Sequence, residues 1–281
     1  MQLPRINVVL PFALASLAVY AASAAPQESP RPRILVTNDD GFDSPGLVAL
    51  VAALSEVGDV VVSAPDGNRS GASLSTVALR GEHGVRRAPI EGASEAWAVD
   101  ATPADAAAFG ILHLAGDRGF DLVVSGINAG PNVGSISHYS GTVGAAMDAA
   151  GRGYTAIAIS QADYRNPARA ADFAATFARR LLDEGGAPGV VYNVNVPMYA
   201  EDEPQPVVVA PMGGQMIELV GVDVELGEGD VGTFSMNIKY PGKELEGCDL
   251  EAFNVGAITI APLRYDWTAE TEVERLGSWK W

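Results

Sequence analysis

The chain has 281 residues, 48% of them hydrophobic and 19% charged, which is typical of a globular protein with one large domain or two small ones. Its formal net charge of −17 repels nucleic acid polymers and anionic lipid surfaces, so neither is expected as a partner. Cys248 is the only cysteine, so an intrachain disulfide is excluded and stability must come from the packing of a core.

The beginning of the chain has the order of a secretory signal peptide. Arg5 precedes an apolar run of about 15 residues, and the small residues ASA stand at 22–24. A membrane-spanning helix needs roughly 20 apolar residues, so a retained anchor is the weaker alternative. We therefore expect residues 1–24 to be a cleaved signal peptide and residues 25–32 to be a disordered, proline-rich leader. The mature chain is then exported to the periplasm or the medium, without membrane attachment.

Short runs of Val, Ile and Leu alternate with helix-like segments along the first two thirds of the mature chain. The predicted strands cover residues 33–38, 59–65, 121–126, 155–160 and 190–197. The predicted helices between them cover residues 45–57, 103–115, 142–151 and 168–183. Proline after Ser44 and after Thr102 is a helix-start signal, and nearly continuous apolar runs suit strands buried on both faces. The alternation predicts a doubly wound α/β fold with a parallel sheet.

Two segments depart from this alternation. Residues 66–100 predict a loop followed by a small β excursion. From residue 204 onward, β-like stretches are separated by glycine and acidic residues, and they suit either a hairpin extension or a second small sheet. We expect one domain over residues 33–281, with a β-rich extension at about 204–255.

Polar stretches follow the first, second and third predicted parallel strands. They are Asn38 to Gly41, residues 64–73 and residues 125–142. Each stretch alone has a structural explanation, because Asp-Gly forms turns and Asn and Ser cap helices. Ligands in open parallel sheets bind at the carboxyl ends of the strands, however, and all of these stretches stand there. Their joint position favours a functional site.

Carboxylates, a hydroxyl and an amide together suit a hard divalent cation. Asp39, Asp40, Ser70 and Asn128 supply the oxygen ligands that Mg²⁺ and Mn²⁺ prefer. The chain has only three histidines and one cysteine, so a zinc site is poorly supplied. Successive strand residues point to opposite faces, so Asp39 and Asp40 can share an ion only if the chain leaves strand geometry, which Gly41 permits.

A phosphate group suits the remaining donors. Ser140 and Thr142 stand just before an Ala-rich helix, where free N–H groups and the positive end of the dipole attract an anion. Simple helix capping is an equally good explanation for both. A bound cation and backbone N–H groups act over a few ångströms, so the negative field of the chain does not exclude an anionic substrate. The sequence has no P-loop motif, no G-x-G-x-x-G motif after a strand and no G-x-S-x-G elbow.

Four ordered stretches resemble the signatures of the SurE-type 5′-nucleotidases: ILVTNDDGFDSPGL, APDGNRSGAS, SGINAGPNVG and YSGTVGAAMDA. The resemblance implies a Rossmann-like three-layer sandwich with a mostly parallel sheet and a C-terminal β-hairpin extension used in dimer or tetramer contacts. It also implies a metal-dependent phosphomonoesterase that acts on nucleoside monophosphates and, in some members, on short polyphosphate.

The resemblance assigns roles to individual positions. One divalent ion per subunit is implied, with ligands from the NDDG, NRSGAS and GINAGPN motifs: Asp39, Asp40, Ser70 and Asn128. The phosphoryl group is held by Asn132, Ser140 and Thr142. The chain departs from many members at residues 135–138, where SISH replaces acidic and aliphatic residues, and it differs from most in its predicted export signal.

The proton acceptor and the route of hydrolysis stay open. Asp40 or Asp39 is favoured over His138 to accept a proton from an attacking water, and an aspartyl-phosphate route is an alternative. Two other functions compete. An exported, non-catalytic binding protein for phosphate compounds usually has two similar lobes, whereas this chain shows one set of strands. A metal-independent serine hydrolase would use Ser70 or the Ser137-His138 pair, without the elbow motif.

Overall fold

The computed structural model describes residues 30–163, 165–198 and 205–280. The predicted signal peptide and residues 25–29 of the predicted leader lie outside this range. The chain from Arg31 onward forms one compact unit. Within the described residues, no helix combines the length and the apolar character needed to cross a membrane.

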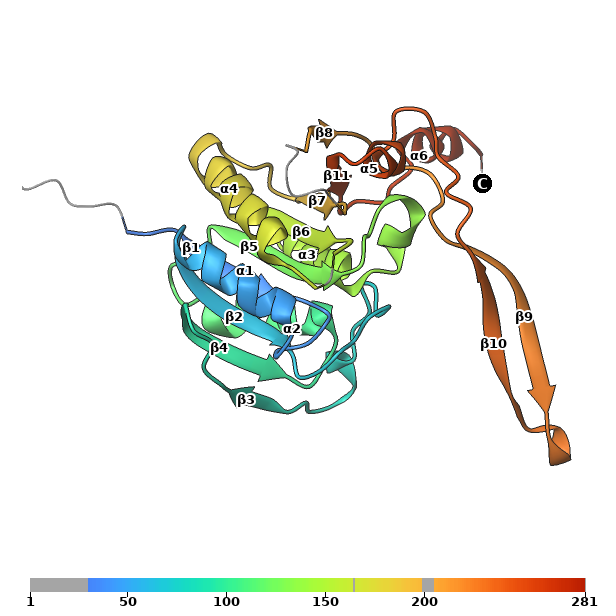
Figure 1. Ribbon diagram of the computed structural model, residues 1–281, viewed down its shortest axis with the longest axis horizontal. Helices are drawn as coiled ribbons and strands as arrows, with labels where there is room; N and C mark the ends of the chain where they lie inside the picture. Colours follow the sequence, from blue (N-terminus) through green and yellow to red (C-terminus); the bar gives the residue numbers. More distant parts are fainter. Residues whose placement is uncertain (1–29, 164, 199–204, 281) are drawn as a thin grey trace, which may run out of the picture. The chain divides into compact units, whose positions relative to one another are not determined.

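A nine-stranded sheet forms the centre of this unit, in the order β3-β4-β2-β1-β5-β6-β7-β11-β8 (Figure 1). Its strands are β1 (Arg33–Thr37), β2 (Asp59–Pro65), β3 (Val85–Arg87), β4 (Ala93–Val99), β5 (Leu122–Ala129), β6 (Ala156–Gln161), β7 (Val190–Val196), β8 (Val207–Val209) and β11 (Ile258–Arg264). The six neighbouring strands β4, β2, β1, β5, β6 and β7 are parallel to one another. At the two sides of this group, β3 is antiparallel to β4, and β11 is antiparallel to β7. The predicted α/β fold with a mostly parallel sheet is confirmed.

Helices cover both faces of the sheet. They are α1 (Pro45–Ser55), α2 (Pro103–Phe109), α3 (Gly141–Gly151), α4 (Ala168–Glu184), α5 (Asp249–Asn254) and α6 (Glu270–Gly277). Short helical turns add η1 (Ala78–Arg80), the π-helix η2 (Gly110–Leu114), η3 (Gly134–His138) and η4 (Glu228–Asp230). Apolar residues of α1 and α4 pack with Ile34 and Val36, while those of α3 and η2 pack with Leu35. Alternate residues of β1 thus face two separate cores, which makes three layers.

The helix starts follow from local chemistry. Ser44 caps α1 by accepting a hydrogen bond from the Leu47 N–H, and Thr102 forms a capping box with Asp105 at the start of α2. The predicted helix over 103–115 is regular only to Phe109. At Gly110 a Cβ would lie 2.7 Å from a methyl carbon of Leu35, so the helix packs closely on β1 at the residue where it becomes a π-helix.

The two segments that depart from the β–α alternation, residues 66–100 and the chain from residue 204 onward, contribute strands to two different sheets. The β excursion within residues 66–100 contributes β3 and β4 to one edge of the main sheet, and β8 joins the other edge through β11. Only β9 (Glu218–Leu226) and β10 (Gly232–Lys239) form a separate antiparallel pair. The predicted C-terminal hairpin is therefore confirmed.

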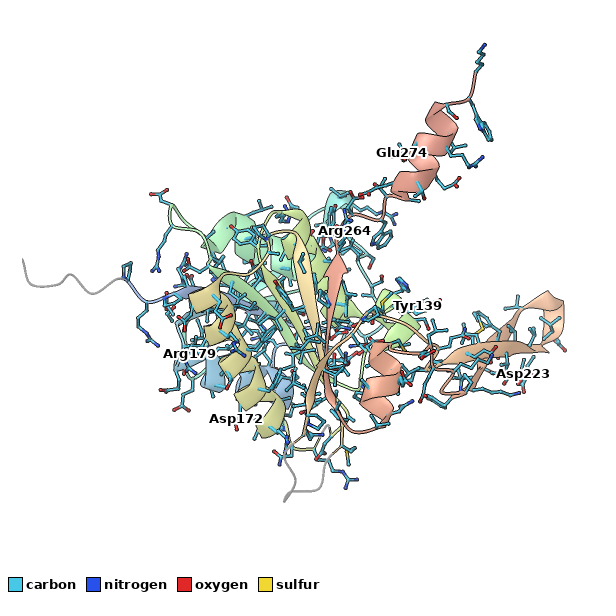
Figure 2. The ribbon with its side chains drawn as sticks, turned by 90° about the horizontal axis from the view of Figure 1, so that it is seen from above. Tyr139, Asp172, Arg179, Asp223, Arg264 and Glu274 are labelled. Carbon is cyan, nitrogen blue, oxygen red and sulfur yellow. The ribbon has the colours of Figure 1, made fainter. Side chains whose placement is uncertain are left out.

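The β9–β10 hairpin has one apolar face and one polar face. Val222 is opposite Met236 and Val224 is opposite Phe234, and all four side chains are exposed. Asp223, labelled in Figure 2, alternates with these valines and is on the polar face. The hairpin therefore exposes an apolar ribbon face to solvent, which is typical of a surface that binds another protein.

Candidate active site

The central strand β1 ends immediately before the predicted acidic pair. Thr37 is the last strand residue, and the Asn38 side chain donates hydrogen bonds to the Gly41 carbonyl (2.9 Å) and the Ser44 hydroxyl (2.8 Å). Gly41 has φ +104°, and a Cβ there would lie 2.8 Å from the carbonyl carbon of Gly67. Only glycine fits this turn without strain. The chain leaves strand geometry here, as the sharing of one ion by neighbouring carboxylates requires.

Asp39 is enclosed by the start of helix α3. The residue is 2% exposed, and the Thr142 hydroxyl donates a hydrogen bond to Oδ1. A Cβ on Gly141 would lie 2.8 Å from Oδ2, so the helix backbone packs directly against the carboxylate. Burial raises the pKa of Asp39 to about 6, the Thr142 hydrogen bond opposes the rise, and the Asp40 charge adds to it. The fold thus holds a desolvated carboxylate beside a second acid.

Asp40 is half-buried and faces strand β5. The Ala129 N–H donates to Oδ2 (2.8 Å), and the Asn68 amide nitrogen lies 3.3 Å from Oδ1. Burial raises the pKa of Asp40, and the hydrogen bond from Ala129 opposes this rise. Neither Asp39 nor Asp40 forms an ion pair with a basic side chain in the part of the chain that the structure describes. Their negative charges are therefore held together without a protein cation to compensate them.

The loop after β2 brings Ser70 to this pair. The Arg69 N–H donates to the Asp39 carbonyl (2.7 Å), and the exposed Ser70 follows it directly. The Ser70 N–H donates to the Asn68 side chain (3.0 Å), which also contacts Asp40. Ser70 is thus tied to the acidic pair through both of its preceding neighbours.

Asn128 reaches the site from β5. It precedes Ala129, whose N–H binds Asp40, and its own amide nitrogen donates to the Gly130 carbonyl (2.7 Å). In the described part of the chain, no hydrogen bond occupies the Asn128 amide oxygen. The oxygen is therefore available as a ligand at the same strand end.

A comparison with known proteins identifies the family. The model of the survival protein SurE family matches residues 34–218. A 5′-nucleotidase SurE from Geobacter metallireducens is 39% identical over 250 residues, which cover 88% of this chain and 97% of the relative. A 5′-nucleotidase SurE from Methylobacterium radiotolerans is 37% identical over 254 residues, covering 87% and 98%. The chain belongs to the SurE family.

A solved structure shows the same family relation at the level of the fold. The crystal structure of the SurE protein from Aquifex aeolicus has a TM-score of 0.75 and 31% sequence identity to this chain. The match covers 87% of this chain and 98% of the Aquifex chain. The resemblance that the motifs indicated is confirmed for both sequence and fold.

The donor set of this SurE member fits a hard divalent cation. Asp39, Asp40, Ser70 and Asn128 offer only oxygen ligands from three neighbouring strand ends. No group of three or more His, Cys, Asp or Glu side chains suited to a metal occurs among the described residues, so a zinc-type cluster is not offered there. Two carboxylates and neutral oxygens are the ligands that Mg²⁺ accepts while it keeps several waters. The uncompensated charge of the acidic pair supplies the attraction.

The three predicted phosphate-binding residues lie in different surroundings. The Ser140 hydroxyl accepts a hydrogen bond from the Val143 N–H (3.1 Å) and caps α3, and Thr142 is bound to Asp39. Asn132 belongs to a buried polar network, where its side chain donates to the Ser160 hydroxyl (2.8 Å) and its N–H donates to the Asn195 side chain (2.6 Å). The contact with Asp39 places Thr142 at the acidic pair, while the substrate-binding roles of all three residues stay predictions.

Several residues that support the site carried no assigned role in the sequence. Asn195 alternates with apolar residues in β7, and that polar position in a buried strand was the available signal. Asn68 lies inside a recognised motif, but its contact with Asp40 joins two separate loops. Asp249 is fully buried, and its carboxylate accepts hydrogen bonds from the N–H groups of Gly134 (3.0 Å) and Gly213 (2.9 Å). Asp249 was not foreseeable, because its stretch matches the family only loosely.

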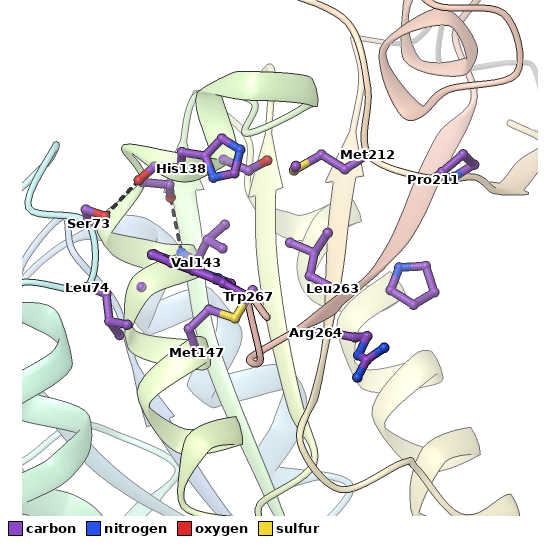
Figure 3. Close-up of a pocket in the computed structure, with 14 residues that line it drawn as sticks. Ser73, Leu74, His138, Val143, Met147, Pro211, Met212, Leu263, Arg264 and Trp267 are labelled. Carbon is purple, nitrogen blue, oxygen red and sulfur yellow. Dashed lines mark hydrogen bonds between the residues drawn. The ribbon is translucent and has the colours of Figure 1, made fainter. Parts of the chain in front are cut away.

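A pocket of about 340 Å³ lies on the other side of the α3 start (Figure 3). It is lined mainly by apolar side chains, including Val143, Met147, Leu263 and Trp267. His138 also lines this pocket, and its carbonyl accepts a hydrogen bond from the Ser73 hydroxyl (2.7 Å).

The hydroxyl of the buried Ser137 is hydrogen-bonded to the backbone. Its hydroxyl donates to the Asn132 carbonyl (2.8 Å), and the described residues show no hydrogen bond from Ser137 to the His138 ring. A serine nucleophile needs its hydroxyl hydrogen-bonded to a base, so the Ser137-His138 pair does not form the arrangement that a serine hydrolase requires.

Proposed function

We propose that this SurE family member is a divalent-metal-dependent phosphomonoesterase, a 5′-nucleotidase that hydrolyses nucleoside monophosphates to nucleoside and phosphate. The observation that carries the proposal is the Asp39–Asp40 pair, which has no cationic partner among the described residues and stands at the carboxyl end of the central strand. The name 5′-nucleotidase SurE, carried by relatives that align over most of the chain, supports the reaction. The start of α3 beside Asp39 supplies N–H groups suited to a phosphate.

One Mg²⁺ or Mn²⁺ ion per subunit fits the ligand set of Asp39, Asp40, Ser70 and Asn128. When bound, such an ion neutralises phosphate charge and lowers the pKa of water. Thr142 fixes the orientation of the Asp39 carboxylate through its hydrogen bond. Asp39 is enclosed by Gly141 and Thr142, which suits a ligand more than a residue that exchanges protons with substrate.

Asp40 is the better acceptor for the proton of the attacking water. It is half-buried, its pKa is raised by burial, and it faces a pocket that reaches solvent. In this route the water oxygen bonds to phosphorus, the bond from phosphorus to the ester oxygen breaks, Asp40 takes one water proton, and the leaving oxygen gains a proton from solvent to give the alcohol. Direct attack by a carboxylate oxygen, which gives an aspartyl phosphate that water then hydrolyses, is the alternative; the configuration at a chiral phosphorus distinguishes the two, because one displacement inverts it and two displacements retain it.

A phosphatase assay with and without chelator tests the function. We expect hydrolysis of nucleoside 5′-monophosphates to be lost in EDTA and restored by Mg²⁺ or Mn²⁺. A non-catalytic binding protein would bind the nucleotide and release no phosphate. A serine hydrolase would keep its full rate after exhaustive removal of metal, and either result overturns the proposal.

We also propose that the mature protein is exported and assembles into homodimers or tetramers. The export proposal rests on the amino-terminal sequence pattern, and amino-terminal sequencing of the native protein tests it, with a start near residue 25 as the expected result. The assembly proposal rests on the apolar face of the β9–β10 hairpin. Light scattering of the Phe234→Ser variant is expected to show smaller particles than the wild type, whereas Thr233→Ser on the polar face should leave them unchanged.

A further inference from the structure

A second pocket opens from Asp40 on the side away from α3. We call it the Gln161 pocket; it has a volume of about 520 Å³ and is lined by Asp40, Asp43, Ser44, Ile127, Ala129 and Gln161, among others. The starts of α1 and α4 border it, through Pro45 and Pro167. The pocket therefore adjoins the acidic pair and extends to the surface beside two helix starts.

Gln161 is joined to the acidic pair through the sheet. It is the last residue of β6 and pairs in register with Ala129, the residue whose N–H binds Asp40. Its own carbonyl accepts a hydrogen bond from the Gly130 N–H (2.9 Å). The backbone of Gln161 is therefore fixed at the same strand ends as the proposed metal ligands.

Among the described residues, none forms a hydrogen bond with the Gln161 side chain. The residue is only 4% exposed, yet neither its amide oxygen nor its amide nitrogen forms a hydrogen bond in the part of the chain that the structure describes. The amide atoms of Gln161 are not among the fully enclosed polar atoms that lack a partner, so they open into the pocket, where water or a ligand can pair with them. A buried amide that lines a pocket with its donor and acceptor both unused points to a ligand.

The pocket is also acidic. Asp66 on its rim forms an ion pair with Arg86 (2.6 Å), and the charge of Asp43 also acts on Arg86, but Asp43 has no ion-pair partner within 4 Å among the described residues. Asp40 adds a second carboxylate at the inner end. Hydroxyl and amino groups donate hydrogen bonds to carboxylates, whereas a further phosphate group is repelled by them.

We propose that the Gln161 pocket binds the alcohol part of the substrate, and that it selects phosphate monoesters whose alcohol part is uncharged and rich in hydroxyl or amide groups. Gln161 pairs with such groups through its amide, and Asp43 disfavours substrates with a second phosphate group. This inference rests on the proposed phosphomonoesterase function, because it needs the reacting phosphate to lie at the acidic pair. It assigns to this chain a preference for monophosphates over bisphosphates and short polyphosphate.

The Gln161→Leu variant tests the amide. We expect kcat/KM for adenosine 5′-monophosphate to fall about tenfold more than kcat/KM for p-nitrophenyl phosphate, because the aryl group has no hydroxyl for Gln161 to bind. The Gln161→Met variant, with an unbranched side chain of similar length, should show the same ratio. Equal losses on the two substrates in both variants would mean that Gln161 is structural, and this would overturn the proposal.

The Asp43→Asn variant tests the charge. We expect kcat/KM for adenosine 3′,5′-bisphosphate, relative to that for adenosine 5′-monophosphate, to rise about fivefold when this carboxylate is neutralised. Asp117→Asn is the matched control, since Asp117 is an exposed acid near the opposite end of the sheet, and its ratio should equal that of the wild type. The charge role is wrong if both variants give the same ratio.

Binding of the alcohol alone separates this inference from the proposed reaction. In the ¹H–¹⁵N spectrum of the wild-type protein, the side-chain amide signal of Gln161 is assigned by its loss in the Gln161→Met variant. We expect adenosine to shift this signal and pyrophosphate to leave it in place. Absence of any shift with adenosine overturns the pocket assignment even if the enzyme is an active phosphatase. A shift in a protein without phosphatase activity supports the pocket and rejects the reaction.

Discussion

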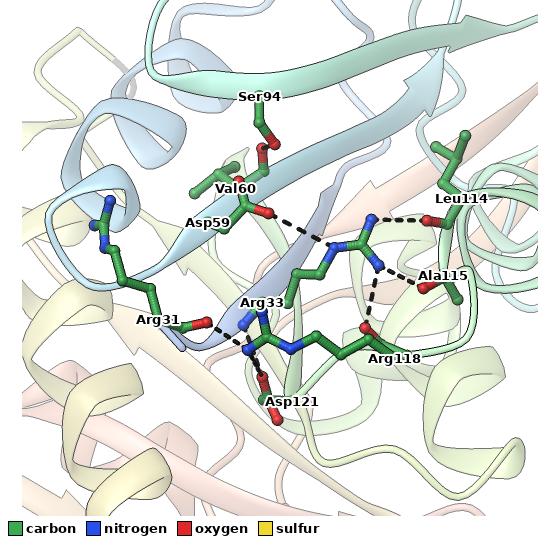
Figure 4. Close-up of polar contacts among 10 residues, drawn as sticks. Arg31, Arg33, Asp59, Val60, Ser94, Leu114, Ala115, Arg118 and Asp121 are labelled. Atoms are coloured by element: carbon green, nitrogen blue, oxygen red, sulfur yellow. Dashed lines mark hydrogen bonds and ion pairs between the residues drawn. The ribbon is translucent and has the colours of Figure 1, made fainter. Parts of the chain in front are cut away.

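The two ends of strand β1 treat charge in opposite ways. At its start, the Arg33 guanidinium donates hydrogen bonds to the carbonyls of Leu114, Ala115 and Gly119 and lies 3.6 Å from the Asp59 carboxylate (Figure 4). It also lies over the Phe120 ring, 4.7 Å from the ring centre. At its other end, Asp39 and Asp40 have hydrogen bonds but no cationic partner among the described residues. The first charge is compensated within the fold, while the charges of the second pair are not compensated by any described basic side chain, and the proposed function assigns a cation to them.

Under the proposed function, this contrast assigns stability to one end of a short strand and activity to the other. Arg33 satisfies the final carbonyls of η2 and so attaches that helix to the sheet. The acidic pair is instead partly removed from water, which is unfavourable for its charges. Hydrogen bonds from Thr142, Ala129 and Asn68 hold the two carboxylates in this position. Desolvated charges that a bound ligand can compensate are typical of functional sites.

The largest expected effect is on turnover at the acidic end. Replacing Asp39 or Asp40 by Asn removes one charge from metal binding and from the neutralisation of the transition state, so kcat should fall about 10²-fold or more. Steady-state assays at saturating Mg²⁺ measure the loss, and circular dichroism checks that the variants are folded. Wild-type turnover in both variants would make these acids structural.

A smaller effect, on stability alone, is expected at the basic end. Arg33→Ala removes the side-chain donor of the Leu114 carbonyl, while the Ala115 carbonyl keeps the Gly119 N–H, and should lower the free energy of unfolding by about 2 kcal/mol. Urea unfolding measures the change, and kcat per folded molecule should stay at the wild-type value. Arg118→Ala, which removes an exposed arginine nearby, should cost much less. A loss of kcat in Arg33→Ala without loss of stability would erase the contrast between the two ends.

The smallest effect is the pH dependence of the metal-free protein. Folding raises the pKa of Asp39 from 3.8 to about 6, so the folded state holds this proton more tightly than the unfolded state does. The contribution of Asp39 to stability is fully present below pH 3.8 and is lost as the pH rises through 6. In EDTA, the wild type should therefore lose about 1 kcal/mol between pH 5 and pH 7 relative to Asp39→Asn.

Thermal or urea unfolding of both proteins at the two pH values provides the measurement. Subtracting the change in unfolding free energy of Asp39→Asn from that of the wild type removes the contribution of the other acids. Addition of Mg²⁺ should reduce the loss, because the cation stabilises the ionised pair. Parallel curves for the two proteins would show that Asp39 titrates as an ordinary exposed acid.

Local sequence determined the framework of the fold and the position of the acidic pair. Apolar runs fixed the central strands, and the Ser44 and Thr102 caps fixed the starts of α1 and α2, because these signals act within a few residues. The order of strands and glycines was also enough to place Asp39, Asp40 and Asn128 at strand ends that meet. The donor chemistry of the loop after the second strand also indicated Ser70, and the family motifs agreed with it, but its connection to Asp39 through the Arg69 N–H is visible only in the fold.

Only the tertiary structure decided how distant segments complete the framework and the site. The pairing of β8 with β11 joins residues about 50 positions apart in the chain, a separation at which local patterns carry no information on pairing. The partners of Asn132 come from β6 and β7, and the contact of Asn68 with Asp40 joins two loops. Gln161 looks like an ordinary strand end in the sequence. Its unused amide became visible only when packing buried it against a pocket, because burial and the absence of a partner are properties of the folded chain.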